Sequence, residues 1–254
     1  MYDVTTAISK GQREYQEDAV VADFNLGNPF GFAVLADGMG GHAAGDVASK
    51  IVVTEVFSEL KFQFGEPESL EKDIATVLQD VARSANDCIS AHVDENPGHQ
   101  GMGATLVAPI IFEKRLYWIS IGDSPLYLFR KGALTQLNED HSMAPQIDVM
   151  VKTGQIDEET ARNHPDRNCL TSVLMGDRIP KIDCRVEPTT LQTGDILVVA
   201  SDGLQFLTDK QIQSTINRAK RKSSAQIAEA LLSAVYKLKD PDQDNISFTV
   251  LKVS

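Results

Sequence analysis

The sequence predicts an α+β domain in which helices and strands form separate layers. Strand-like segments occur in groups instead of alternating one-for-one with helices, which disfavours a doubly wound parallel sheet. Apolar residues make up 42% of the chain and charged residues 24%, as in ordinary globular proteins. The 254 residues suit one large domain or two small ones. Because no linker, repeat or low-complexity tract interrupts the chain, we expect a single domain over residues 1–254.

The first part of the chain contains three predicted strands followed by two predicted helices. Val, Ala and Phe recur there with the partial alternation that strands show. The predicted strands are residues 2–9, 18–25 and 30–37. A helical pattern then runs from Ala43 to Leu60. Pro67 suits the first position of a second long helix, whose apolar residues keep helical spacing to about Val93.

Strands return in the centre of the chain and close it. They are predicted at residues 103–112, 115–123, 125–132, 133–137, 195–203 and 245–253. Between them, residues 140–176 are polar and irregular, with two short helical pieces, the second capped by Asp157. Thr208 and Gln211 have the spacing of a capping box, which marks a helix start. A last helix is expected from Ser224 to about Lys239.

The formal net charge of −12 makes nucleic acid an unfavourable partner, because phosphate binding needs a basic surface. The acidic residues either form a solvated surface or gather in part around metal cations. Cys88, Cys169 and Cys184 are widely spaced and form no C-x-x-C motif, so a disulfide framework is not expected. The sequence shows neither a signal-peptide pattern nor an apolar run of the ~20 residues that span a bilayer. We therefore expect a cytoplasmic protein without a membrane segment.

A glycine-rich turn after the third predicted strand resembles a phosphate-binding turn. Gly38–Ala43 matches G-x-G-x-x-A, but Asp37 would place a negative charge beside a bound pyrophosphate. Gly40–Val47 is close to a P-loop, yet Asp46 stands where the lysine is needed. The P-loop interpretation is therefore rejected, and the dinucleotide interpretation is disfavoured. The remaining alternatives are a plain turn with one capping aspartate, or a carboxylate that holds a hard cation beside a backbone carbonyl.

Four more acidic positions lie at ends of predicted strands, which favours the metal site. Asp202 and Asp123 follow strands, whereas Asp244 and the pair Glu17–Asp18 precede them. Gathered together, these carboxylates would repel one another unless cations neutralised them. The segment around Asp244 is not an EF-hand, because its glycine and its bidentate glutamate are missing.

Oxygen ligands without a His or Cys cluster favour Mg²⁺ or Mn²⁺. Two such ions can activate a water and promote displacement at phosphorus. Arg13, five residues before Asp18, is either a ligand for phosphoryl oxygens or a surface ion-pair partner. A cysteine-based phosphatase is excluded, because no Cys-x5-Arg motif is present.

Taken together, these motifs resemble those of the metal-dependent protein serine/threonine phosphatases of the type 2C family, bacterial members in particular. The matching segments occur in the family's order and extend from Gly11 to the C-terminus. They are GQREYQED, LADGMGGHAAGDVAS, GMGATL, GDSPLYL, EETARNHPDRNCLT, ASDGLQFLTD and DQDNISFTV.

The resemblance implies a four-layer α-β-β-α sandwich of two antiparallel sheets, with a mobile flap at about 140–176. It implies two Mn²⁺ or Mg²⁺ ions, with a third ion as in many bacterial members, and hydrolysis of phosphoserine and phosphothreonine by direct attack of a metal-activated water. The implied substrates are phosphorylated proteins, including a bacterial Ser/Thr kinase that the enzyme opposes, and we expect a monomer. The implied metal ligands are Asp37, the Gly38 carbonyl, Asp202, Asp244 and, for a third ion, Asp123. Arg13 would hold the phosphate, and Glu17 and Asp18 would act through metal-bound waters.

The sequence departs from the family pattern at a few positions. Gln16 replaces an Asn, and Met39 stands where eukaryotic relatives often carry a histidine proposed as the leaving-group acid. The acid is therefore unassigned, and His42 is either a candidate or a structural residue at a helix start. Pro125 and Ser172 each replace an Arg common in the family. Two alternatives therefore stand beside the phosphatase: a pseudophosphatase that binds without turnover, and a hydrolase of other phosphoesters.

One basic run, Arg218–Lys222, has no role in the predicted metal site. It either complements the dipole at a helix C-terminus or forms a docking patch for an acidic partner.

Overall fold

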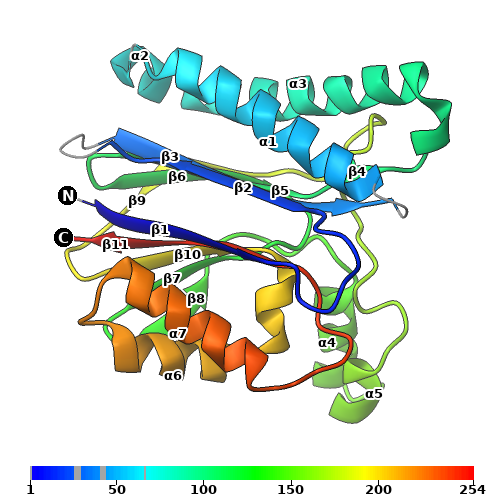
Figure 1. Ribbon diagram of the computed structural model, residues 1–254, viewed down its shortest axis with the longest axis vertical. Coiled ribbons are helices and arrows are strands. Elements are labelled where there is room, and N and C mark those ends of the chain that lie inside the picture. Colours follow the sequence, from blue (N-terminus) through cyan, green and yellow to red (C-terminus); the bar gives the residue numbers. More distant parts are fainter. Residues whose placement is uncertain (1, 26–29, 41–43, 66) are drawn as a thin grey trace.

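Four layers make up the protein in a computed structural model that describes residues 2–25, 30–40, 44–65 and 67–254. Two antiparallel sheets lie face to face, and helices cover the outer face of each (Figure 1). Both termini lie at the same end of the sheets. The predicted α+β class and the α-β-β-α order of layers are confirmed.

The first sheet follows the order β2-β3-β5-β6-β9, with the short β4 paired to β3. Its strands are β2 (Asp18–Asp23), β3 (Phe30–Met39), β4 (Gly103–Ala104), β5 (Leu106–Phe112), β6 (Arg115–Ile121) and β9 (Asp183–Thr190). The helices on this side are α1 (Ala44–Gln63), α2 (Pro67–Lys72) and α3 (Ile74–Glu95), followed by the 3₁₀ turn η1 (Pro97–His99).

The second sheet follows the order β1-β11-β10-β7-β8. Its strands are β1 (Tyr2–Ser9), β11 (Ile246–Val253), β10 (Ile196–Ala200), β7 (Leu126–Arg130) and β8 (Ala133–Gln136). The helices α6 (Asp209–Ala219) and α7 (Ser224–Tyr236) cover it, and the 3₁₀ turn η2 (Asp202–Phe206) follows β10. The predicted flap carries α4 (Ala144–Lys152) and α5 (Glu158–Arg162) and lies beside this half of the sandwich.

Three hydrophobic cores hold the four layers together, one at each boundary between layers. Strand β3 shows how one segment serves two of them. Phe32 and Val34 pack toward the helices α1 and α3, whereas Leu35 packs between the sheets. This alternation follows from the two-residue period of a strand. Phe32 is fully buried, and burying such a side chain contributes about 2–3 kcal/mol.

The predicted second helix, from Pro67 to about Val93, is wrong in one respect, because the structure breaks it into α2 and α3. Asp73 adopts φ −104° and ψ 19°, which is not helical. Leu70 and Ile74 are both buried and keep the four-residue spacing of a helix across the break. Periodicity alone therefore could not reveal it.

Strand β9 was not predicted, because its sequence DCRVEPTT is polar and contains Pro188. It is the edge strand of the first sheet, where proline and exposed polar residues are tolerated. The last helix ends at Tyr236, three residues before the predicted Lys239. Lys239 has φ 53°, which a continuing helix does not allow. The capping box at Thr208 and the Asp157 cap are both confirmed.

Candidate active site

The β2–β3 hairpin carries two of the predicted acidic residues. Asp18 and Asp37 are direct partners in the register of the two strands, so their side chains lie on the same face. That face continues from Leu35, which packs between the sheets. Both carboxylates therefore face the second sheet. Asp18 is only 5% exposed, and Asp37 is partly buried.

A hydroxyl pair fixes the backbone at Asp37. Its N–H donates to Thr105 Oγ1 over 2.9 Å, and its carbonyl accepts from the Thr105 N–H over 2.9 Å. Thr105 Oγ1 lies 2.8 Å from Ser124 Oγ. The following Gly38 has no space for a side chain, because a Cβ there would lie 2.0 Å from the Gly45 carbonyl oxygen. The predicted ligands Asp37 and Gly38 are thus placed by buried contacts.

The second sheet supplies Asp202 and Asp244 from the ends of two neighbouring strands. Asp202 follows β10 and Asp244 precedes β11, and these strands pair antiparallel. Ser201, between β10 and Asp202, donates from its hydroxyl to Asp18 Oδ2 over 2.8 Å and so links the two sheets. Gly203 allows the close approach, because a Cβ there would lie 1.8 Å from the Asn245 carbonyl oxygen.

Asn245 fastens the loop that carries Arg13 and Glu17. It is 4% exposed, and its amide donates to the carbonyls of Lys10 and Tyr15 over 2.8 and 2.9 Å. Its side-chain oxygen accepts from the Glu17 N–H over 2.7 Å. Arg13 in this loop forms an ion pair with the carboxylate of Asp244, next to Asn245 in the chain.

Asp123 belongs to the turn between β6 and β7, and the start of the flap holds this turn in place. The preceding Gly122 has φ 104°, which favours glycine. Its carbonyl accepts from the His141 N–H over 3.0 Å, and its own N–H donates to His141 Nδ1 over 3.3 Å. Burial lowers the pKa of His141, which keeps its ring neutral and able to accept that bond.

The predicted acidic residues lie close enough to affect one another's ionisation. Burial, followed by the charge of Asp18, raises the pKa of Asp37. Burial and then the charge of Asp202 raise the pKa of Asp123 to about 7. Burial, followed by the charge of Asp244, raises the pKa of Asp202. The structure therefore brings together residues from both sheets that are far apart in the sequence.

Two observations test whether these residues suit divalent cations. Asp18 Oδ1 and Glu17 Oε1 are buried and have no hydrogen-bond partner within the described chain. Lone carboxylate oxygens and mutually raised pKa values are what a cation would relieve. In the part of the chain that the structure describes, however, no three His, Cys, Asp or Glu side chains already form a complete metal-binding group. The residue types fit Mg²⁺ or Mn²⁺, which keep several water ligands, and the ligand set stays a prediction.

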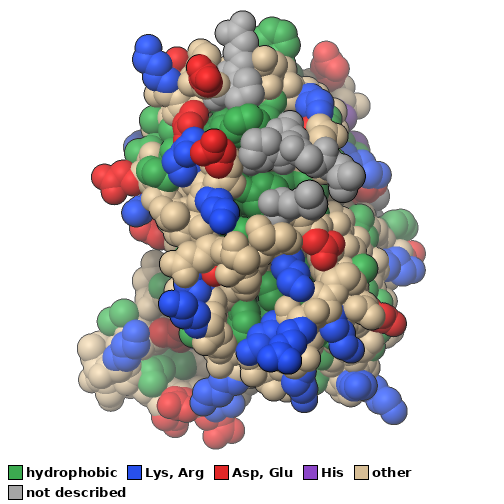
Figure 2. All heavy atoms as spheres, turned by 90° about the vertical axis from the view of Figure 1, so that its left-hand side faces the viewer, with side chains coloured by type: hydrophobic (Ala, Val, Ile, Leu, Met, Phe, Trp, Pro, Cys, Tyr) green, Lys and Arg blue, Asp and Glu red, His purple; other side chains and the backbone are tan. Residues whose placement is uncertain are grey.

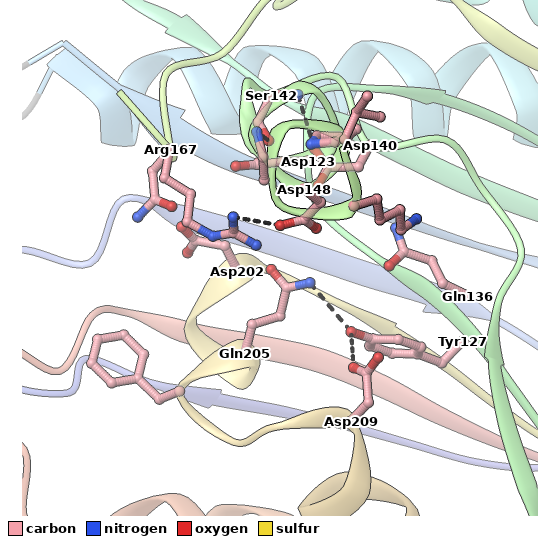
Figure 3. Close-up of a pocket in the computed structure, with 16 residues that line it drawn as sticks. Asp123, Tyr127, Gln136, Asp140, Ser142, Asp148, Arg167, Asp202, Gln205 and Asp209 are labelled. Atoms are coloured by element: carbon pink, nitrogen blue, oxygen red, sulfur yellow. Dashed lines mark hydrogen bonds and ion pairs between the residues drawn. The ribbon is translucent and has the colours of Figure 1, made fainter. Parts of the chain in front are cut away.

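A cleft of about 800 Å³ opens beside these carboxylates, between the flap and the second sheet. Asp123 and Asp202 lie in its wall (Figure 3). From the flap, Arg167 pairs with Asp148 over 2.7 Å. On the opposite wall Tyr127 donates to Asp209 over 3.2 Å. The predicted flap segment therefore borders the site, whereas its mobility stays a prediction.

The structure shows what Ser172 and Pro125, two departures from the family pattern, contact. Ser172 is buried, donates to the Lys181 carbonyl over 2.6 Å and accepts from the Lys181 N–H over 3.1 Å. Ser172 therefore braces the base of the flap. The Pro125 carbonyl accepts from the Ala200 N–H over 3.0 Å, which ties it to the second sheet. His42, the candidate acid, lies outside the described residues, as does Ala43, the predicted start of the first helix.

Sequence reasoning missed the residues that position the carboxylates. Thr105, Ser201 and Asn245 each make one or more of the hydrogen bonds described above. All three lie inside segments that carry the family resemblance, and Ser201 and Asn245 also directly adjoin predicted ligands in the sequence. The role of Thr105 could not be predicted from these signals, because its contact with Asp37 depends on strand pairing.

The chain is similar to known protein phosphatases in sequence. A model of the family described as protein phosphatase 2C matches residues 6–237. The serine/threonine phosphatase stp of Listeria innocua is 35% identical over 190 residues, which cover 74% of this chain and 72% of that protein. The protein is thus a metal-dependent phosphoprotein phosphatase. It belongs to the protein phosphatase 2C family.

Other relatives agree with this assignment. Serine/threonine protein phosphatase PstP of Mycobacterium tuberculosis is 36% identical over 196 residues, which cover 76% of this chain and 34% of that protein. The solved structure of the S. agalactiae serine/threonine phosphatase has a TM-score of 0.81, at 27% identity over all of both chains. The PstP catalytic domain, solved in complex with two manganese ions, has a TM-score of 0.75 at 29% identity, covering 100% of this chain and 99% of that one.

Within the described residues, none of the helices combines the length and the apolar character that crossing a membrane requires.

Proposed function

We propose that this phosphatase hydrolyses phosphoserine and phosphothreonine in proteins, using two Mn²⁺ or Mg²⁺ ions. The proposed ligands are Asp37, the Gly38 carbonyl, Asp202 and Asp244, with Asp123 and Asp202 available to a third ion. The proposal rests on one observation. Carboxylates from both sheets lie at the same end of the sandwich, where burial and mutual repulsion raise their pKa values.

The cations, when bound, supply Lewis-acid activation of a water and neutralise charge on the phosphoryl group. Residues of the chain itself bind waters and the phosphate and fix their positions. Asp18 and Glu17 each carry a buried oxygen without a hydrogen-bond partner in the described structure, so they are free to accept from waters in the site. The hydroxyl of Ser201 fixes the other oxygen of Asp18 and sets its orientation.

Arg13 provides the binding group for the phosphate. Its guanidinium has five N–H donors in a fork that matches phosphoryl oxygens. The ion pair with Asp244 holds it at the site, while its side chain remains 55% exposed and accessible to substrate. The Asn245 bonds fix the loop and therefore the position of Arg13 relative to Asp244. The phosphoryl group is thus oriented before reaction.

The cleft beside Asp123 and Asp202 is the proposed binding site for the substrate polypeptide. Asp148, Lys152 and Arg167 line it on the flap side, and Tyr127, Gln205 and Asp209 line it on the opposite side. A protein substrate, such as an autophosphorylated Ser/Thr kinase that this phosphatase opposes, would present its phosphorylated side chain from the cleft. Incubation with such a kinase and detection of its remaining phosphothreonine test this part of the proposal.

The central test compares aspartates two residues apart. Asp244→Asn and Asp202→Asn should lower Mn²⁺-dependent hydrolysis of p-nitrophenyl phosphate and of a phosphothreonine peptide by about a hundredfold or more. Asp242→Asn is the matched control, because Asp242 is exposed and belongs to the same loop. Calorimetric titration with Mn²⁺ should show weaker binding in the first two variants only.

Retained turnover in both ligand variants would refute the assignment. A wild-type protein that binds Mn²⁺ without hydrolysing either substrate would instead indicate a pseudophosphatase. Faster hydrolysis of other phosphoesters than of phosphopeptides would indicate a different phosphoesterase. The first two outcomes are distinguishable because binding and turnover are measured separately, and the third because the rates on both kinds of substrate are compared.

A further inference from the structure

A groove of about 670 Å³ lies between α6 and α7, apart from the carboxylate site. Its rim residues follow helical spacing on both sides. On α6, Lys210, Ser214 and Arg218 recur every four residues and share one face. On α7, Ala230 and Ala234 lie in the floor, and Lys237 follows the helix at the rim. Two helices therefore present a continuous groove.

The floor of the groove is apolar and its rim is cationic. The apolar lining residues are Leu207, Ala219, Ala230, Ala234 and Leu238. Lys210, Arg218, Lys222 and Lys237 supply the charge, and the lining contains no acidic residue. All four cations are exposed, and none forms an ion pair with another described residue.

This concentration of positive charge is unexpected in a protein with a formal net charge of −12. Figure 2 shows several Lys and Arg side chains on the lower part of one face, with some Asp and Glu side chains near its lower edge, in the half of the molecule to which α6 and α7 belong (Figure 1). Such a local field attracts acidic partners even when the whole molecule is acidic.

Helix electrostatics explains only part of the pattern. Arg218 lies in the last turn of α6, and Lys237 follows the end of α7, where cations complement the helix dipole. Lys210 lies in the first turn of α6, where a cation is unfavourable. The basic run at Arg218–Lys222 is thus one side of a larger cationic rim.

We propose that the groove between α6 and α7 docks an acidic segment of the phosphoprotein substrate, at a distance from the phosphorylated residue. Acidic side chains of that segment pair with the rim, and one or two large apolar side chains cover the floor, as in other helix-lined grooves. A peptide fits better than a nucleic acid or a membrane surface, because the groove is concave and its apolar floor suits the apolar side chains of a peptide. The inference rests on the proposed phosphatase activity and adds a substrate feature to it.

Direct binding is measured first, with a fluorescein-labelled peptide of Glu with Leu at every third or fourth position. Fluorescence anisotropy should show binding that weakens as NaCl rises from about 0.05 M to about 0.5 M, because salt screens exposed pairs. A peptide with Gln in place of Glu should bind at least about tenfold more weakly. Absence of binding by the wild type, or equal binding of both peptides, would overturn the proposal.

Charge reversal then locates the site. The double variant Lys210→Glu, Arg218→Glu should bind the acidic peptide about tenfold more weakly or worse. The matched control is Lys72→Glu, Arg178→Glu, which changes the charge equally at exposed positions of the first half of the sandwich. It also reverses one cation in the last turn of a helix, as Arg218→Glu does. Equal losses in both variants would overturn the assignment to the groove.

Kinetics connect docking to catalysis. With a phosphothreonine peptide linked to the acidic segment, the groove variant should raise KM several-fold and leave kcat unchanged. Its hydrolysis of p-nitrophenyl phosphate should equal that of the wild type, which also shows that it is folded. If the wild type does not hydrolyse p-nitrophenyl phosphate, the proposed function fails, whereas an unchanged KM in the groove variant refutes docking alone. Binding of anionic phosphatidylserine vesicles in preference to the acidic peptide would also refute it.

Discussion

Replacing Asn245 by Ala should both destabilise the protein and weaken phosphate binding. The substitution removes three hydrogen bonds of 2.7–2.9 Å to the backbone of the loop that carries Arg13. Asn245 is buried, so its three partners would lose their bonds in a place with little water. At about 1 kcal/mol for each bond, the free energy of unfolding should fall by about 3 kcal/mol.

Urea denaturation measures the loss of stability, and steady-state kinetics with p-nitrophenyl phosphate measure the effect on the site. We expect KM to rise, because the Arg13 loop is no longer fixed. Asn86→Ala is the matched control. Asn86 is buried and also makes three hydrogen bonds with backbone groups, to Met175 and Gly176 at the end of the flap segment and to Asp177, and none with the Arg13 loop.

The control should lose similar stability and keep its KM. A stability loss below about 0.5 kcal/mol in Asn245→Ala would show that the three bonds are replaced by water, against the reasoning from burial. An unchanged KM, or equal KM changes in both variants, would show that the loop does not depend on Asn245 for the position of Arg13.

Three further predictions concern the site and the core. Gly203→Ala should weaken Mn²⁺ binding by about tenfold or more in calorimetry, because its Cβ would lie 1.8 Å from the Asn245 carbonyl oxygen; Gly98→Ala, with open space around it, should have no effect. Without metal, the Tm should fall as the pH rises from about 4 to about 7. Folding raises the pKa of Asp123 to about 7, so over this range the unfolded state loses its proton while the folded state keeps it, and the folded state becomes less stable relative to the unfolded state. Mn²⁺ should raise the Tm more at pH 7 than at pH 5, and a Tm in EDTA that rises over this range would contradict the argument. Phe32→Ala should lower the free energy of unfolding by about 3–5 kcal/mol in urea, because it empties a fully buried site.

The sequence predicted most strands and helices because they carry local signals. Apolar runs, the Asp157 cap and the Thr208 capping box are all read within a few residues, and the structure has them where they were expected. Local signals failed where the outcome depends on neighbours. Strand β9 is stabilised by pairing with β6, and the break at Asp73 leaves the apolar spacing intact.

The same distinction between local signals and contacts with neighbouring segments applies to the site. The sequence by itself determined which residue types are available, since aspartates at strand ends favour hard cations. Only the tertiary structure decided that Asp18 lies opposite Asp37, that Ser201 reaches Asp18 from the other sheet, and that the α6–α7 groove has a cationic rim. The physical reason is that burial and mutual repulsion depend on distances in space, which strand register and sheet stacking set and which spacing along the chain does not contain.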